Sequence, residues 1–192
     1  MPSFYPNLVT LDSSPGHRRE VAILDEMLTA GWGVKDSFRA LDLGPQGFSV
    51  VIEGEWYLKE PGSSWPTSAA SYSAVKSVGT PDELDRWVSA WGETPSGERI
   101  FVPEILQDQS VEFLFVEQAG EPIAGLVTNK SWSVYGISNA FGDPEGIVSC
   151  IESISRKDDE RAIVGYGSRF EVEFLSRFGF RSIGGLQVWV KQ

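Results

Sequence analysis

The segment from Ser133 to Ser155 constrains the fold more than any other part of the sequence. It begins with an apolar run, SVYGISNAFG, and continues into DPEGIVSCIESIS, whose apolar residues recur at helical spacing. Gly142 permits a tight turn, Asp143 can cap the helix, and Pro144 suits its first position. The sequence therefore predicts a strand, a turn and a helix, whose free N–H groups point to where α/β proteins commonly bind anions.

The charges in this turn oppose such binding. Asp143 and Glu145 place two acidic side chains in the first helical turn, and no Lys or Arg lies between Lys130 and Arg156. Acidic side chains stabilise a helix N-terminus but repel an anionic ligand there. The segment therefore predicts the fold more strongly than the function.

Length and composition predict one folded domain, or one domain with an extra subdomain. The chain has 192 residues, 41% of them hydrophobic, and a formal net charge of −11. An acidic surface repels phosphate backbones and anionic lipids, so we expect neither nucleic acid nor a membrane as a partner. No apolar run approaches the ~18 residues of a membrane span, and the N-terminus lacks the features of a secretory signal. A single cysteine, Cys150, fits a cytoplasmic protein with an inert, packed thiol.

Residues 1–70 predict a helix and two or three strands. The helix runs from 14 to 31, beginning at a Ser-Pro pair and ending at a glycine. Residues 37–60 are typical of strands, with a bend or tight turn at 53–55. Residues 61–70, rich in Ser, Pro and Gly, form a loop and the best internal boundary of the chain.

Two single residues in this region could belong to a site. His17 is the only histidine, and the sequence provides no visible partner to orient it, so we expect an exposed side chain and neither Ser–His–Asp nor Cys–His catalysis. Trp65 either packs over the core or lines a pocket, and packing is the favoured interpretation. The sequence contains no cluster with metal-ligand spacing.

Residues 71–192 predict a strand, a helix, a helical turn, three antiparallel strands, a helix, a strand, a helix and a strand. Capping boxes mark helix starts at Thr80 and Ser168. Alternating apolar residues followed by an Ala-Gly turn predict a hairpin, and the next strand should pair beside it. The strands and the helical turn are predicted at 71–78, 102–108 (the turn), 111–118, 122–130, 133–142, 161–167 and 183–191.

This order of elements, with a hairpin written QAGEPIAGLVTN and a C-terminal FLSRFGFRSIGGLQVWVK, resembles the GNAT superfamily of acyl-CoA N-acyltransferases. The resemblance covers residues 71–192, and residues 1–70 form an N-terminal extension that packs on the sheet or extends it. It implies an α+β fold, a mixed and mainly antiparallel sheet flanked by helices. It also implies transfer of an acyl group from acetyl-CoA or another acyl-CoA to an amine.

The family's pyrophosphate loop typically reads Arg/Gln-x-x-Gly-x-Gly/Ala. Asn139, Gly142 and Pro144 stand at the matching positions, and only the glycine agrees. The family's strands part beside this loop and admit the pantetheine arm of the cofactor by main-chain pairing. The resemblance therefore implies a cofactor site formed by Ile137, Asn139, Phe141, Gly142, Gly146 and Ser168.

Catalytic groups are implied less directly. Many family members carry an Asn and a proton-donating Tyr in the last helix, where Ser168 and Leu175 stand here. Leu175 cannot donate a proton, so Tyr166, at the end of its strand, is the candidate acid, with packing as the alternative. The candidate bases are Glu112 and Glu117, for which a solvated strand face is the favoured interpretation. Trp132 and Tyr135 either line an acceptor cleft or cover the sheet.

Two functional hypotheses follow from the resemblance. The first is an N-acyltransferase with a small-molecule or other amine acceptor. The second is a non-catalytic binding or regulatory module that has lost acyl-CoA. A third class is a structural homodimer that uses the aromatic-rich surface. Fold alone does not decide among these functions.

Overall fold

The computed structural model describes residues 6–14, 16–66, 72, 74–92 and 100–192. These residues form nine strands and four α-helices. The strands are β1 (Leu8–Val9), β2 (Gly33–Asp36), β3 (Phe48–Lys59), β4 (Lys76–Ser77), β5 (Val111–Gln118), β6 (Glu121–Ser131), β7 (Val134–Gly142), β8 (Ala162–Gly167) and β9 (Arg181–Lys191). The helices are α1 (His17–Met27), α2 (Pro81–Trp91), α3 (Pro144–Lys157) and α4 (Arg169–Ser176), with 3-10 turns η1 (Gly44–Gln46) and η2 (Pro103–Gln107).

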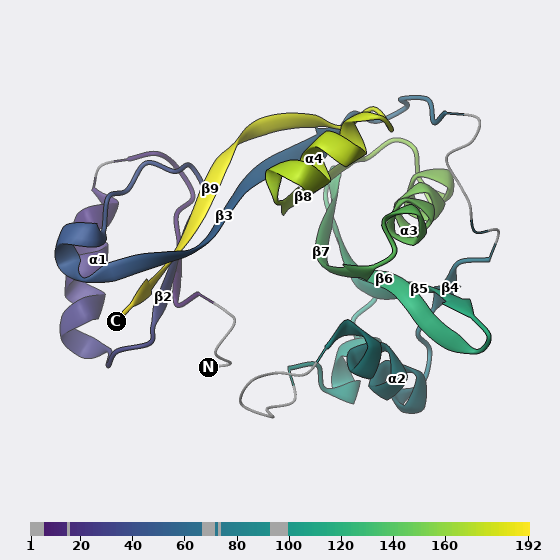
Figure 1. Cartoon of the computed structure of the whole chain (residues 1–192), viewed down its shortest axis with the longest axis horizontal. Coiled ribbons are helices and arrows are strands. Elements are labelled where there is room, and N and C mark those ends of the chain that lie inside the picture. The colour runs from purple at the N-terminus through teal and green to yellow at the C-terminus, as the bar shows by residue number, and fades with distance from the viewer. Residues whose placement is uncertain (1–5, 15, 67–71, 73, 93–99) are drawn as a thin grey trace.

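All nine strands belong to one sheet, in the order β1-β2-β9-β3-β8-β7-β6-β5-β4. Neighbouring strands are antiparallel except for the pairs β1–β2 and β7–β8, which are parallel. Helices α3 and α4 cover one face and α2 covers the other, while α1 packs at the far end of the long β3–β9 pair (Figure 1). The predicted α+β class, with a mixed and mainly antiparallel sheet flanked by helices, is confirmed.

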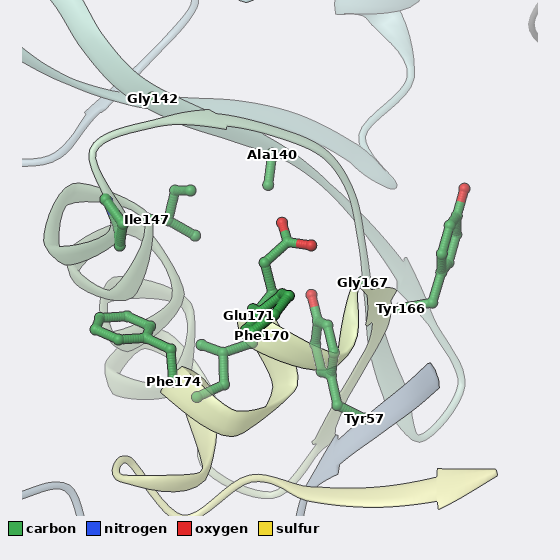
Figure 2. A pocket seen from close by; sticks show the side chains of 11 residues that line it. Tyr57, Ala140, Gly142, Ile147, Tyr166, Gly167, Phe170, Glu171 and Phe174 are labelled. Atoms are coloured by element: carbon green, nitrogen blue, oxygen red, sulfur yellow. The ribbon is translucent and has the colours of Figure 1, made fainter. Parts of the chain in front are cut away.

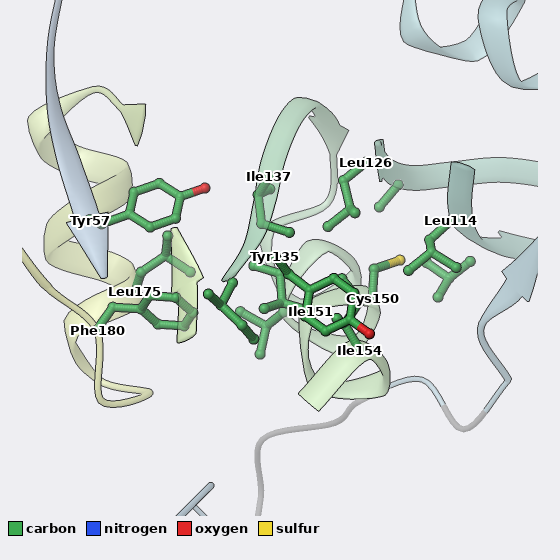
Figure 3. Packing of buried hydrophobic residues seen from close by; sticks show 14 of the residues in the cluster. Tyr57, Leu114, Leu126, Tyr135, Ile137, Cys150, Ile151, Ile154, Leu175 and Phe180 are labelled. Atoms are coloured by element: carbon green, nitrogen blue, oxygen red, sulfur yellow. The ribbon is translucent and has the colours of Figure 1, made fainter. Parts of the chain in front are cut away.

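The core is divided by the sheet. Strand β5 shows this division, because Leu114 and Val116 join the cluster under α3 and α4, whereas Phe113 and Phe115 join the cluster under α2. Figure 3 shows the first cluster, in which Ile151 of α3 packs between residues of β5 to β8. Strands buried on both faces lose the simple alternation of apolar and polar residues, which explains the near-continuous apolar run of β5.

Side chains cap three helices as the sequence predicts. Thr80 and Ser168 each accept a hydrogen bond from the third residue of their helix, and the Glu at that position bonds back to complete a capping box. Asp143 caps α3 by accepting a hydrogen bond from the Gly146 N–H at 2.9 Å. These contacts fix the starts of α2, α3 and α4 at the predicted residues.

The prediction of two or three strands in residues 37–60, with a bend at 53–55, is wrong. Residues 48–59 form one strand, β3, which pairs with β9 along its length and with β8 over its second half. Gly54 lets the backbones of β3 and β8 approach closely, because a Cβ on residue 54 would lie under 3.0 Å from the Gly167 carbonyl oxygen. The four-residue strand β2 was not predicted.

Two other boundaries differ from the prediction. Helix α1 ends at Met27 rather than Gly31, since Leu28 has an extended backbone. Of the predicted strand 71–78, only Lys76–Ser77 is a strand, while residues 71 and 73 lie outside the described part of the chain.

The strand order also concerns the predicted boundary at residue 70 between the N-terminal extension and the rest of the chain. Strands β5, β6 and β7 are neighbours as expected, but the last strand, β9, does not pair with β8. Strand β3 lies between them, so residues 48–59 supply an inner strand of the sheet rather than an addition at its edge. The division into 1–70 and 71–192 stays a prediction.

Three single residues can now be placed. Cys150 is fully buried, and burial raises the pKa of its thiol to about 12. Trp65 packs against Phe178 and Phe180 on the core under α4. His17 does have a partner, contrary to the prediction, because its Nε2 lies 2.9 Å from Asp12 Oδ1 and the side chain is only 22% exposed. Among the described residues, no helix is both long and apolar enough to cross a bilayer.

Candidate functional site

Strands β7 and β8 part in the middle of the sheet. They pair with each other from Val134 to Gly136 on β7 and from Ala162 to Val164 on β8, and beyond these residues the ladder between the two strands ends. A bulge accompanies the separation, because two residues, Asn139 and Ala140, stand opposite one residue of β6. Asn139 adopts φ = 51°, a left-handed conformation that Asn tolerates better than most residues. The predicted parting of these strands is therefore present.

Two cavities meet at this separation. The first has a volume of about 310 Å³ and lies between α3, α4 and the strand ends (Figure 2). The second has a volume of about 380 Å³ and extends toward β3 and α2. The residues that line both cavities, which we call the opening, are Tyr57, Ala140, Tyr166, Gly167 and Glu171.

The two cavities differ in chemistry. The first is completed by mostly apolar side chains, and one of them, Phe170, is 83% exposed at its edge. The second includes a further carboxylate and several polar groups. The remaining lining residues are Gly142, Pro144, Ile147, Phe170, Phe174 and Leu175 in the first cavity, and Ile52, Glu53, Trp91, Ile137, Ser138, Asn139 and Ser168 in the second.

Tyr57 of β3 is the most buried polar side chain of the opening. It is 4% exposed, its ring packs edge-on against Phe180, and its hydroxyl points into the first cavity (Figure 2). The Tyr57 ring lies over Gly165 of β8, and a Cβ on Gly165 would lie under 3.0 Å from atoms of the Tyr57 side chain. Burial raises the pKa of the Tyr57 hydroxyl, as do the negative charge of Glu171 and the neighbouring Tyr166, so this group is a neutral proton donor at physiological pH.

Sequence reasoning missed Tyr57, although one signal was available. A glycine inside a strand often marks close approach by another group, and Gly165 in AIVGYG is such a glycine. The register that places Tyr57 directly opposite Gly165 depends on β3 lying beside β8, which local sequence does not reveal.

Glu171 was identified only as part of a capping box. Its Oε2 accepts a hydrogen bond from the Ser168 N–H at 2.6 Å, which holds the side chain over Gly167. In Figure 2 its carboxylate points into the cavity beside the Tyr57 hydroxyl. A carboxylate and a phenol therefore face the same space.

Tyr166 lies on the other side of β8, as Figure 2 shows. Its ring packs edge-on against Trp56 at 5.3 Å, and the Lys35 ammonium lies 3.7 Å from the ring centroid. Burial lowers the pKa of Lys35 to about 8. The predicted acid thus lines the opening within an aromatic and cationic cluster formed by Lys35, Trp56 and Tyr166.

The N-terminus of α3 is closed by its own residues. The Gly146 N–H donates its hydrogen bond to the Asp143 carboxylate, and Pro144 has no N–H that could bind a ligand. The Asp143 carboxylate also interacts with Tyr72. Burial raises the pKa of the Tyr72 hydroxyl, and the negative charge of Asp143 and the hydrogen bond between the two side chains raise it further. A diphosphate placed here would meet two carboxylates and few donors, so this part of the site does not fit the diphosphate of CoA.

The predicted cofactor residues fall into two groups. Ile137, Asn139 and Ser168 line the second cavity and Gly142 lines the first. Phe141 and Gly146 line neither cavity. Phe141 packs edge-on against Trp87 on the α2 side, at 5.1 Å, because the bulge at Asn139 reverses the direction of the following side chains.

The structure does not bring the predicted bases to the opening. Glu112 of β5 forms an ion pair with Lys157 at 2.7 Å, and Glu117 pairs with Lys76 and Arg86. Strand β6 and strand β7 lie between these carboxylates and the opening. Trp132 is 94% exposed and Tyr135 is buried in the core, and neither lines either of the two cavities described above. Within the same residues, no group of His, Cys, Asp and Glu could hold a metal ion.

Comparison with solved structures identifies the architecture. No family model matches the sequence, and no curated protein is significantly similar to it. A putative acetyltransferase of the GNAT family from Novosphingobium aromaticivorans superposes with a TM-score of 0.58 at 12% identity, over 93% of this chain and 82% of that one.

Two further structures agree over a similar extent. A GCN5-related N-acetyltransferase-like protein from Streptococcus suis has a TM-score of 0.58 at 11% identity, over 92% of this chain and 76% of that one. A functionally unknown conserved protein from Staphylococcus epidermidis has a TM-score of 0.59 at 13% identity, over 92% and 77%. The resemblance seen in the sequence is thereby confirmed for the architecture, and the chain has the fold of the GCN5-related N-acetyltransferases.

Proposed function

We propose that this protein is an N-acyltransferase that moves an acyl group from a pantetheine thioester, such as that of acyl-CoA, to an amine. The observation that carries the proposal is the opening between β7 and β8, at which two cavities meet. Where the ladder between β7 and β8 has ended, the edge of β7 offers main-chain donors and acceptors to the amide groups of a pantetheine arm. The donor would enter from the apolar cavity and the acceptor from the other one.

The residues of the opening provide a complete path for the protons. The amine nitrogen of the acceptor attacks the thioester carbonyl carbon, and a C–N bond forms. The C–S bond then breaks, the sulfur takes the proton of the Tyr57 hydroxyl, and Glu171 takes the proton released by the nitrogen. Return of that proton from Glu171 to Tyr57 restores the site, and an amide and a thiol leave. General acid catalysis of this kind contributes about 10²- to 10⁴-fold to a rate.

The second cavity favours a positively charged acceptor. Glu171 lines it beside the aromatic rings of Trp91 and Tyr166, and so does Glu53, whose carboxylate already pairs with Arg39. Carboxylates and aromatic faces attract an ammonium group, and the net charge of −11 acts in the same direction at longer range. The expected acceptors are therefore primary amines that carry positive charge, rather than acidic amino compounds.

A second candidate is a binding module that no longer uses acyl-CoA. The observation that favours it is the closed N-terminus of α3, where Asp143 and Pro144 leave little room for a diphosphate. The absence of nucleic-acid and membrane partners, a homodimer and a cytoplasmic location are compatible with both candidates, and they rest on the acidic charge and the single cysteine.

Calorimetric titration with acetyl-CoA and longer acyl-CoAs, combined with thiol release in the presence of a panel of amines, tests the proposal. A ligand with a Kd below about 100 μM should stabilise the protein by about 1.4 kcal/mol or more at tenfold excess over that Kd. Binding together with amine-dependent thiol release supports the transferase, whereas binding without transfer to any amine contradicts it. Failure of every thioester to bind would remove the first proposal and favour the module that no longer uses acyl-CoA.

A further inference from the structure

We propose that the acyl donor is recognised through its acyl and pantetheine parts alone, and that the nucleotide diphosphate part of CoA contributes no binding energy. This inference rests on the proposed function and specifies the ligand of the same site. A pantetheine thioester without a nucleotide would then serve as well as the CoA thioester.

The first argument is that the chain fills the anion position of α3 itself. The Asp143 carboxylate accepts the Gly146 N–H at 2.9 Å, so an amide that could bind a phosphate oxygen is already satisfied by a negative group. Pro144 lacks a donor, and Glu145 adds a second carboxylate in the first turn. A diphosphate would have to displace a cap that stabilises the helix and would gain like-charge repulsion in return.

The second argument is that both glycines of this segment have structural explanations. Gly142 has φ = 83°, and a Cβ there would lie under 3.0 Å from the Ile123 carbonyl oxygen. A Cβ on Gly146 would lie under 3.0 Å from side-chain atoms of Ala124 and Val116. Glycine is therefore required here by packing of α3 and β7 on β6, independently of any phosphate.

The third argument concerns the cations. Among the described residues, neither cavity is lined by Lys, Arg or His. Of the cations near the cavities, Lys35 lies against the rings of Trp56 and Tyr166 on the other side of β8, and Arg39 is held in an ion pair with Glu53. By contrast, the apolar lining from Ile147, Phe174 and Leu175 offers a surface for an uncharged acyl or pantetheine chain.

Calorimetric titration of the full chain with S-acetylpantetheine, acetyl-CoA and adenosine 3′,5′-bisphosphate tests the inference. We expect the two thioesters to bind with Kd values that differ by less than about 3-fold, and the nucleotide to give no heat of binding. An acetyl-CoA affinity more than about 3-fold above that of S-acetylpantetheine would overturn the inference while leaving the transferase proposal intact. If neither thioester binds, the transferase proposal itself fails, so the two failures are distinguishable.

A pair of variants makes the test sharper. The double substitution Asp143→Asn and Glu145→Gln keeps a side-chain acceptor at the cap and removes both negative charges. We expect it to raise acetyl-CoA affinity by about tenfold and to leave S-acetylpantetheine affinity unchanged. Asp82→Asn, which neutralises a first-turn acid of α2 away from both cavities, is the matched control and should change neither affinity. An equal effect on both thioesters, or no effect on either, would contradict the inference.

Discussion

The two ends of the proposed donor site differ in how well their side chains suit the ligand. At the opening, the backbone has the separated strands and the bulge that the fold needs in order to admit a slender ligand. At the N-terminus of α3, the backbone is equally well placed, but the side chains of Asp143, Pro144 and Glu145 close it to anions. The shared fold therefore accounts for the main-chain geometry at both ends but not for the side chains at the N-terminus of α3. Ligand binding has to be argued separately for the opening and for the start of α3.

The junction between the two ends gives the largest expected effect. Gly142→Ala places a Cβ against the Ile123 backbone in a left-handed conformation, so we expect a loss of about 3 kcal/mol in the free energy of unfolding. Gly120→Ala is the control, because Gly120 also has a positive φ but has nothing within 4 Å of its Cβ position. That variant should lose about 1 kcal/mol in urea denaturation. Equal losses would mean that the close contact at the junction does not matter.

The chemistry of the opening is tested by Tyr57→Phe. Removing the hydroxyl leaves the packing against Phe180 intact and should lower kcat for thiol release about 10²-fold, with little change in KM. Tyr166→Phe should have a smaller effect, because that ring lies on the other side of β8. A larger loss from Tyr166→Phe would return the role of the acid to the residue that the sequence suggested. The double variant Tyr57→Phe and Leu175→Tyr should regain part of the activity if a phenol from α4 can reach the same space.

The α3 end is tested by stability. Asp143→Ala removes the cap of α3 and should cost about 1 kcal/mol in unfolding free energy, whereas Asp143→Asn should stay within about 0.5 kcal/mol of the parent protein. Thermal or urea denaturation of the three proteins, side by side, measures this difference. If Asp143→Ala were fully stable, the carboxylate would not be serving as a helix cap.

The last expected effect depends on pH and concerns Lys35 behind the opening. Burial lowers the pKa of Lys35 from 10.5 to about 8, so between these pH values the unfolded chain binds more protons than the folded one. Its contribution to the unfolding free energy should therefore rise as the pH rises from 8 to 10.5. Urea denaturation of the parent and of Lys35→Met should show the difference between them shifting in favour of the parent at pH 9.5 relative to pH 7. A pH-independent difference would contradict the lowered pKa.

The sequence predicts local elements well because their signals are local. The capping boxes at Thr80 and Ser168, the hairpin after Val111–Gln118 and the strand, turn and helix around Gly142 are all present. The parting of β7 and β8 followed only from the resemblance to a family. Composition and spacing alone would not have revealed it.

The site was predicted less well because it depends on distant partners. Tyr57 and Glu171 meet only because β3 lies between β8 and β9, and no local pattern encodes that order. Glu112 looked like a base on an exposed strand position, but Lys157 pairs with it at the end of α3. His17 was judged to have no partner because Asp12 precedes the helix in an irregular segment.

The position of β3 has a consequence for the order in which the sheet can form. Both of its neighbours, β8 and β9, follow it at a long distance in the sequence. Contacts so far apart in sequence form slowly, because a long loop must close before they can be made. The catalytic apparatus proposed here would therefore exist only after β9 has been synthesised, and a translation product that stops before β9 would lack a working centre.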